Sequence, residues 1–244
     1  MPDRVVMWDF DGTLGTRVAT VRGVRGGVRG ALWAQTLVEV LDERMPSHGV
    51  AVGDLRPHLQ SRFPWHEPER VHTDLGTADE WWARYTPIFA GAFEAVGLPT
   101  PLAAALADGV RGRYLAPSSW RLFPDTIPVL RKLSDAGWDH VILSNHVPEL
   151  ENLVDALGLS EVVLATVCSA VIGYEKPHAE AFRIAREVAG KPTELWMVGD
   201  NPQADVLGAE QVGIPAILVR RPPGPDVLRS VVDLAGAAAH ILAE

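Results

Sequence analysis

Side chains that could hold a metal ion and an anion stand at four separate points of the chain. They are Asp9 and Asp11, then Ser144 and Asn145, then Lys176, and finally Asp200 and Asp205. Carboxylates held close together repel one another unless a cation lies among them. An all-oxygen set without His or Cys favours Mg2+ over zinc. These residue types therefore predict a bound divalent ion, with Lys176, Ser144 and Asn145 as donors to an anion such as a phosphoryl group.

These side chains can meet if the elements before them are strands of one parallel sheet, and the sequence pattern predicts such a sheet. The apolar run Val5–Trp8 ends at Asp9, and beyond Pro124 helical and strand patterns alternate. Alternation of this kind is typical of an α/β fold with a doubly wound parallel sheet and helices on both faces. Ligands bind such sheets in the crevice at the carboxyl ends of the strands. The predicted elements are helix 127–136, strand 139–144, helix 149–157, strand 162–166, helix 179–189, strand 195–199, helix 204–211 and strand 216–219.

A helical segment separates the first predicted strand from the rest of the sheet. Apolar residues recur at helical spacing over 28–43, 78–96 and 102–114. The simplest architecture is an α/β core of residues 1–14 and 121–244, interrupted by a helical domain of residues 15–120.

Composition narrows the class of protein. The chain has 244 residues, of which 47% are hydrophobic and 22% charged, as in globular proteins. A formal net charge of −9 argues against a nucleic-acid partner, and no apolar run is long enough to span a membrane. Cys168 is the single cysteine, which excludes an intramolecular disulfide and suits a reducing compartment. We therefore expect a soluble, cytoplasmic protein without a membrane partner, either a monomer or a homodimer.

The four motifs, in this order and approximate spacing, resemble those of the haloacid dehalogenase-like hydrolase superfamily. The predicted helical domain lies where this family inserts its helical cap of the first type. The resemblance implies a Rossmann-like core and the phosphatase branch of the family. The matching residues are Asp9-Phe10-Asp11-Gly12-Thr13-Leu14, Leu143-Ser144-Asn145, Lys176-Pro177 and Gly199-Asp200 to Asp205.

The resemblance also implies a role for each matched residue. Asp9 would attack phosphorus to form an aspartyl-phosphate, and Asp11 would act as general acid and then as general base. Mg2+ would be held by the Asp9 side chain, the Asp11 backbone carbonyl and Asp200, with Asp205 behind these ligands. The substrate would be a small phosphorylated molecule. The residues implied in binding its phosphoryl group are Gly12, Thr13, Ser144, Asn145 and Lys176.

Three other functions remain open alternatives. A phosphomutase would use the same residues, although family mutases tend to place another acid where this chain has Gly199. A haloacid dehalogenase would need neither the acid at Asp11 nor a metal. A catalytically idle binding protein should have lost one of the motif residues, and none is missing.

Two features of the predicted cap bear on the substrate. Arg17 and Arg22 follow the first motif closely enough to overhang the site and contact an anionic substrate. The aromatic residues between 63 and 85 are interpreted as the core of the cap rather than as a substrate platform. They are Phe63, Trp65, His66, Trp81, Trp82 and Tyr85.

Overall fold

The chain folds into two compact units in the computed structural model, which describes residues 2–18 and 31–244. Unit 1 consists of Met1–Thr16, Pro68–Leu75 and Leu122–Glu244, and unit 2 of Arg17–Glu67 and Gly76–Arg121. Pro68–Leu75 lies within the predicted helical domain, yet it belongs to unit 1. The backbone N–H of His72 donates to the carbonyl of Gly173 at 2.8 Å, which ties this segment to the α/β unit.

Unit 1 is built on a six-stranded sheet with the strand order β5-β4-β1-β6-β7-β8. All of its strand pairs are parallel, and Met7 in β1 pairs with Val141 on one side and Met197 on the other. Residues Val5–Trp8 are buried, as expected for a strand covered on both faces. The strands are β1 (Arg4–Trp8), β4 (Asp139–Ser144), β5 (Ala165–Cys168), β6 (Glu194–Gly199), β7 (Ala216–Val219) and β8 (Ser230–Val231).

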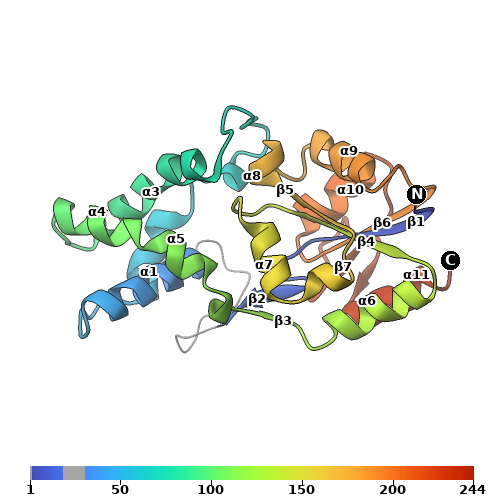
Figure 1. Cartoon of the computed structure of the whole chain (residues 1–244), viewed down its shortest axis with the longest axis horizontal. Coiled ribbons are helices and arrows are strands. Elements are labelled where there is room, and N and C mark those ends of the chain that lie inside the picture. Colours follow the sequence, from blue (N-terminus) through green and yellow to red (C-terminus); the bar gives the residue numbers. More distant parts are fainter. Residues whose placement is uncertain (1, 19–30) are drawn as a thin grey trace. The chain divides into compact units, whose positions relative to one another are not determined.

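Helices cover both faces of this sheet (Figure 1). Helices α9 (Ala179–Val188) and α10 (Gly208–Gln211) pack together on one face, and α6 (Thr126–Asp135) and α11 (Leu234–Ile241) pack together on the other. The shorter helices α7 (Leu150–Ala156) and α8 (Ser169–Ile172) flank β5 in sequence. The predicted doubly wound parallel α/β fold is thereby confirmed. No helix in the described part of the chain is both long and apolar enough to cross a lipid bilayer.

Two predicted elements of unit 1 differ from the observed ones. The predicted strand 162–166 is observed as Ala165–Cys168, after the 3-10 turn η4 (Leu159–Glu161), because pairing with β4 sets the register: Ser144 pairs with Cys168. The predicted helix 204–211 begins earlier, as the π-helix η5 (Pro202–Leu207), and continues as α10. Asn201 starts it by accepting hydrogen bonds from the N–H groups of Gln203 and Ala204.

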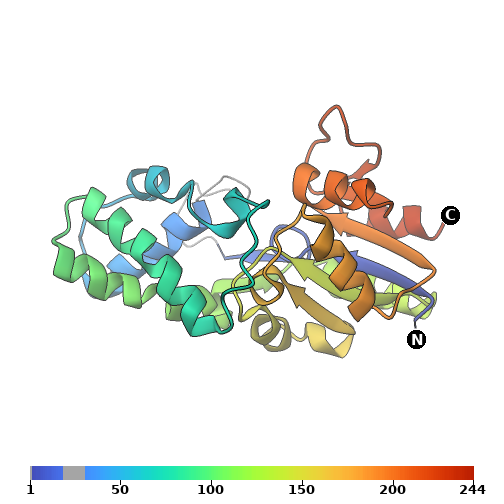
Figure 2. The same ribbon diagram turned by 90° about the horizontal axis from the view of Figure 1, so that it is seen from above.

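Unit 2 is helical over most of its described residues (Figure 2, blue to green). The predicted helix 102–114 is divided at Gly109, and the described part of the predicted helix 28–43 is α1. Residues 28–30 and the candidate Arg22 lie outside the described residues. The helical elements are α1 (Ala31–Arg44), α2 (Val52–Leu55), η1 (Arg56–Leu59), η2 (Pro64–His66), α3 (Ala78–Ala95), α4 (Thr100–Asp108), α5 (Val110–Leu115) and η3 (Pro117–Ser119).

The core of unit 2 is rich in aromatic side chains. Trp33 stacks on Tyr114 with 4.2 Å between ring centroids, and it stacks on Phe63 at 5.4 Å. Trp81 and Trp82 are buried as well. These rings fill the interior of the unit, in agreement with their interpretation as core residues, whereas Trp65 and His66 are half-buried.

Strands β2 (Gly15–Arg17) and β3 (Trp120–Leu122) form a separate two-stranded sheet. They contain two of the positions at which the chain passes from one unit to the other. In unit 1, the Phe123 N–H donates to the Leu14 carbonyl at 3.0 Å, and the Thr126 hydroxyl donates to the same carbonyl at 2.6 Å. These bonds fasten the turn after β1 to the start of α6.

Candidate functional site

Asp9 stands at the carboxyl end of the central strand β1, and its carboxylate is held from two sides. Oδ1 accepts hydrogen bonds from Ser144 Oγ and Lys176 Nζ, both at 2.9 Å. Oδ2 accepts one from Thr13 Oγ1 at 3.2 Å. Asp9 is only 7% exposed. The ends of β1 and β4 and the loop before α9 thus bring together residues from three of the four sequence motifs.

Lys176 is the cation at the centre of this group. Its Nζ donates to Asp9 Oδ1 at 2.9 Å, Asp205 Oδ1 at 2.6 Å and the Leu143 carbonyl at 2.7 Å. Burial lowers the pKa of the amino group, but the Asp205 and Asp9 carboxylates outweigh this effect and raise the pKa to about 12. The side chain therefore remains a fixed positive charge at neutral pH.

Asn145 positions the backbone that carries Lys176. Its Nδ2 donates to the Lys176 carbonyl at 2.9 Å, and its Oδ1 accepts from the Lys176 N–H at 2.8 Å. This pair of bonds joins the loop after β4 to the loop before α9. Asn145 was predicted as a phosphate donor. In this structure its side chain holds the backbone of Lys176 and thereby positions the Lys176 ammonium group.

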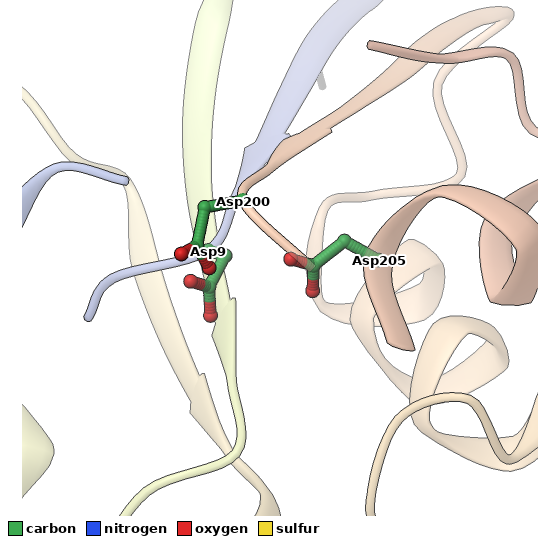
Figure 3. Close-up of side chains that lie close together, drawn as sticks. All are labelled: Asp9, Asp200 and Asp205. Carbon is green, nitrogen blue, oxygen red and sulfur yellow. The ribbon is translucent and has the colours of Figure 1, made fainter. Parts of the chain in front are cut away.

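Three buried carboxylates converge beside Lys176 (Figure 3). Each of Asp9, Asp200 and Asp205 offers an oxygen, and these oxygens all lie within 4.8 Å of one another. Burial raises the pKa of Asp200 to about 6, with Asp9 adding to the shift and Arg221 opposing it. Burial also raises the pKa of Asp205 to about 7, against the lowering effect of Lys176. Full ionisation of these buried carboxylates is therefore unfavourable without further positive charge, which an oxygen-seeking divalent cation would supply, so the donor set fits Mg2+.

The two oxygens of Asp205 already have partners within the protein. Oδ1 accepts from Lys176 Nζ, and Oδ2 accepts from the Asn201 N–H at 2.9 Å. Asp205 thereby joins the loop after β6 to the central lysine. The predicted place of Asp205 behind the metal ligands stays a prediction.

The turn after β1 passes very close to Asp200. Gly12 has φ +95°, and a Cβ at this position would lie 2.5 Å from Asp200 Oδ2. A side chain is therefore excluded on both conformational and steric grounds. The N–H groups of Gly12 and Thr13 donate within the turn, to the carbonyls of Gly15 and Phe10. Their predicted binding to a phosphoryl group stays a prediction.

Asp11 lies in the same turn and is half-buried. Its backbone forms a bridge with Gly15. Among the described residues, the carboxylate cluster consists of Asp9, Asp200 and Asp205 and does not include Asp11. The side chain of Asp11, two residues beyond Asp9 in the chain, is thus not part of this cluster.

Two arginines after β7 belong to this site and were not among the predicted residues. Arg221 Nε donates to Asp200 Oδ2 at 2.6 Å. Arg220 donates from Nε to the Thr13 carbonyl at 2.9 Å and from Nη2 to Asp125 Oδ1 at 2.6 Å. The signal available in the sequence was their position at the carboxyl end of the last predicted strand, the edge at which the other site residues also lie.

Glu175 is a second buried group that sequence reasoning missed. It is 1% exposed, and its Oε2 has no hydrogen-bond partner among the described residues. Burial raises the pKa of Glu175 to about 8, while the Ser169 hydroxyl and the Lys176 charge oppose the shift. The carboxyl group is therefore largely protonated at neutral pH.

Arg17 does not have the role that the sequence suggested. Its side chain is buried in unit 2, where it donates to Glu39 Oε2 at 2.8 Å and to the Tyr114 carbonyl at 3.0 Å. Arg113 binds the same Glu39 oxygen at 2.7 Å. The Arg17 charge is thus already neutralised inside unit 2, so the hypothesis that it contacts an anionic substrate is wrong.

The chain is similar to known hydrolases over most of its length. A family model described as haloacid dehalogenase-like hydrolase matches residues 4–213. A phosphoserine phosphatase of Thermus thermophilus is 34% identical over 188 residues, which cover 70% of this chain and 74% of that protein. This match extends well beyond the short motifs.

Solved structures share the fold of the whole chain. The HAD-hydrolase YfnB of Bacillus subtilis, whose structure is bound to magnesium, has a TM-score of 0.71 at 17% identity and covers 100% of both chains. A 2-haloacid dehalogenase of Pseudomonas syringae has a TM-score of 0.64 at 23% identity, covering 100% of this chain and 99% of that one. At these identities the likeness establishes the fold alone.

Proposed function

Because the chain belongs to the haloacid dehalogenase-like hydrolase family, we propose that it is a Mg2+-dependent phosphatase acting on a small phosphorylated metabolite through an aspartyl-phosphate. The observation that carries this proposal is the setting of Asp9. Its carboxylate lies at the end of β1 with Ser144 and Lys176 on one oxygen and Asp200 and Asp205 within reach. This setting supports Asp9 as the nucleophile, Ser144 and Lys176 as fixed donors, and a metal bound beside them.

In the first step, an Asp9 oxygen attacks phosphorus and the bond from phosphorus to the leaving oxygen breaks. Ser144 and Lys176 hold the carboxylate in one orientation for this attack. Lys176 also offsets the repulsion between the carboxylate and the phosphoryl oxygens. Asp11 gives its proton to the leaving oxygen, so that a neutral alcohol departs.

In the second step, Asp11 acts in the opposite sense. It takes a proton from a water molecule, whose oxygen attacks phosphorus and releases Asp9 and inorganic phosphate. The Asp9 side chain, the Asp11 backbone carbonyl and Asp200 would hold Mg2+, which would supply the positive charge that the transferring phosphoryl group requires. Asp205 keeps Lys176 in place through the 2.6 Å contact.

The relatives and the site together favour a phosphatase over a dehalogenase. The phosphoserine phosphatase is the more similar in sequence, at 34% identity. The likeness to the dehalogenase structure is one of fold, and a dehalogenase has no use for a metal-binding carboxylate cluster. Asp11 and the cluster of Asp9, Asp200 and Asp205 both support phosphoryl transfer.

Gly199 argues against the phosphomutase alternative. A Cβ at Gly199 would collide with the carboxylate of Asp205. This position therefore has no room for the additional acid that family mutases tend to carry there. The site as built suits release of phosphate to water.

The predicted cap, residues 15–120, would determine which substrate is accepted. The site in unit 1 would bind only the phosphoryl group, and the cap would bind the rest of the substrate. Substitutions in the cap should consequently change the preference among substrates more than the rate on a generic aryl phosphate.

A screen of purified protein against phosphorylated metabolites tests the proposed function. Phosphate release is measured with Mg2+ and with excess chelator, for the wild type, Asp9→Asn and the matched exposed variant Asp155→Asn. We expect release that requires Mg2+, is lost in Asp9→Asn and is kept in Asp155→Asn. Release that continues in chelator would refute the metal, and release by Asp9→Asn would refute the nucleophile. Phosphate release from none of the substrates would favour a binding protein.

A further inference from the structure

We infer that Arg221 is an internal counter-cation of the metal site, which competes with Mg2+ for Asp200 and thereby sets the affinity of the site for the metal. The inference rests on the proposed function insofar as Mg2+ is the metal. It begins from the 2.6 Å contact between Arg221 Nε and Asp200 Oδ2. Nothing in the four motifs assigns Arg221 a role.

Lys176 and Arg221 contact different carboxylates of the cluster. Lys176 contacts Asp9 at 2.9 Å and Asp205 at 2.6 Å. Among the described residues, no hydrogen bond of Lys176 reaches Asp200, whereas Arg221 contacts it directly. Each acid therefore has a cationic partner, and that of Asp200 is Arg221.

The two cations differ in their freedom to move. The Lys176 side chain is 1% exposed, whereas that of Arg221 is 36% exposed. Arg221 also lies just before Pro222-Pro223-Gly224-Pro225, a segment of exposed residues outside any helix or strand. A guanidinium at the surface can turn into water when its carboxylate oxygen is taken by a metal, but a buried ammonium cannot. Arg221 is therefore the partner that can be exchanged for Mg2+.

The ion pair between Arg221 and Asp200 matters because Asp200 is buried. An ion pair between two exposed side chains contributes little to stability. The Asp200 side chain is only 10% exposed, so its charge must be balanced either by the guanidinium or by a metal. If the guanidinium and Mg2+ contact the carboxylate at the same time, their positive charges repel each other, and this repulsion weakens the binding of Mg2+. Removal of the Arg221 charge should therefore tighten Mg2+ binding and destabilise the metal-free protein.

The test compares Arg221→Gln, Arg221→Lys and the control Arg131→Gln in the full chain, first freed of metal with chelator. Arg131 is an exposed arginine of α6 whose only described ion pair, at 3.9 Å, is with Glu161, so its loss makes the same change in net charge away from the cluster. Mg2+ binding is measured by calorimetry without substrate. Thermal melting is measured in chelator and in excess Mg2+.

We expect Arg221→Gln to bind Mg2+ about tenfold more tightly than the wild type, since a nearby positive charge is lost. Arg221→Lys, which keeps the charge, should stay within about threefold of the wild type, and Arg131→Gln should match it. In chelator, Arg221→Gln should melt at a lower temperature than the wild type, and excess Mg2+ should remove most of this difference.

Two results would overturn the inference while leaving the proposed function intact. One is wild-type or weaker Mg2+ affinity in Arg221→Gln, and the other is unchanged melting of its metal-free form. Absence of Mg2+ binding in the wild type would overturn both the inference and the proposed metal dependence. The binding measurement therefore separates the two failures.

Discussion

The ammonium group of Lys176 lies 2.9 Å from the Asp9 carboxylate and 2.6 Å from that of Asp205, with almost no solvent around it. One cation thus holds the nucleophile of the proposed reaction and an acid from η5. The consequence is that catalysis and the stability of the metal-free site depend on the same side chain.

Replacement of this lysine should therefore affect both properties. We expect Lys176→Met to lower kcat by at least about 100-fold, because a fixed donor to the transferring group is lost. We also expect a loss of about 3–5 kcal/mol in the free energy of unfolding, because the buried Asp205 is left without its cation. Steady-state rates and urea unfolding measure the two effects, with Lys132→Met on the exposed face of α6 as control. A folded, fully active Lys176→Met protein would contradict the arrangement proposed for the site.

The stabilising effect of Mg2+ should depend on pH. In the metal-free protein, the pKa values of Asp200 and Asp205 are about 6 and about 7, both above the ordinary value of 3.8. The folded state thus binds more protons than the unfolded state between about pH 4 and pH 7, and its stability falls as pH rises through this range. Burial is the main cause of this loss, and a bound Mg2+ would supply the ionised carboxylates with a counter-charge.

Thermal melting at pH 5 and at pH 8, in chelator and in excess Mg2+, measures this dependence. The two pH values lie on either side of the pKa values of about 6 and about 7. We expect the increase in Tm caused by Mg2+ to be larger at pH 8. An equal increase at both pH values would show that the metal does not bind this carboxylate cluster.

Asp11→Asn should affect the two chemical steps differently for alkyl and aryl substrates. An alkyl phosphate expels an alkoxide, which needs a proton as the bond breaks, so the first step should become slow. An aryl phosphate expels a stabilised phenolate and needs little help, so only hydrolysis of the aspartyl-phosphate should become slow. The aryl substrate should then release a burst of phenol while the phosphoenzyme accumulates.

Rapid-quench measurement of phenol and of protein-bound phosphate tests this expectation. Asp9→Asn serves as the reference that should show neither a burst nor bound phosphate. If Asp11→Asn slows alkyl and aryl substrates by the same factor without a burst, the acid and base roles belong to another residue.

Glu175→Gln should make the stability of the protein less sensitive to a rise in pH from the ordinary pKa of the carboxyl group, 4.5, to about 8. Burial raises the pKa of Glu175 to about 8 in the folded protein, from an ordinary value of 4.5. Between these values the folded state keeps a proton that the unfolded state has lost, so stability falls as pH rises, by up to about 1.4 kcal/mol per pH unit. Gln cannot ionise and should remove this contribution.

Urea unfolding of the wild type and Glu175→Gln at pH 6 and pH 8, both in chelator, measures the difference between the two slopes. The carboxylates of Asp200 and Asp205 titrate in both proteins and cancel in this comparison. Parallel loss of stability in the two proteins would place the ionisation elsewhere.

The sequence by itself was sufficient to predict the α/β sheet and the edge at which the site lies. The alternation of helical and strand patterns predicts a parallel sheet, and the carboxyl ends of parallel strands lie at one edge of the sheet. Asp9, Ser144 and Asp200 each follow a strand, so their convergence was a consequence of topology. Lys176 and Asp205 do not directly follow a strand, and they were predicted from their sequence motifs.

The partners of these side chains were decided only by the tertiary structure. Arg221 lies 21 residues from Asp200 and Lys176 lies 167 residues from Asp9, and neither spacing carries a local signal. Contacts of this kind depend on strand order and on the path of loops, which local propensity does not encode. Arg17 shows the converse, because its position near the first motif suggested a substrate contact. In the folded chain it is buried in unit 2 and paired with Glu39, since a buried charge requires a counter-charge.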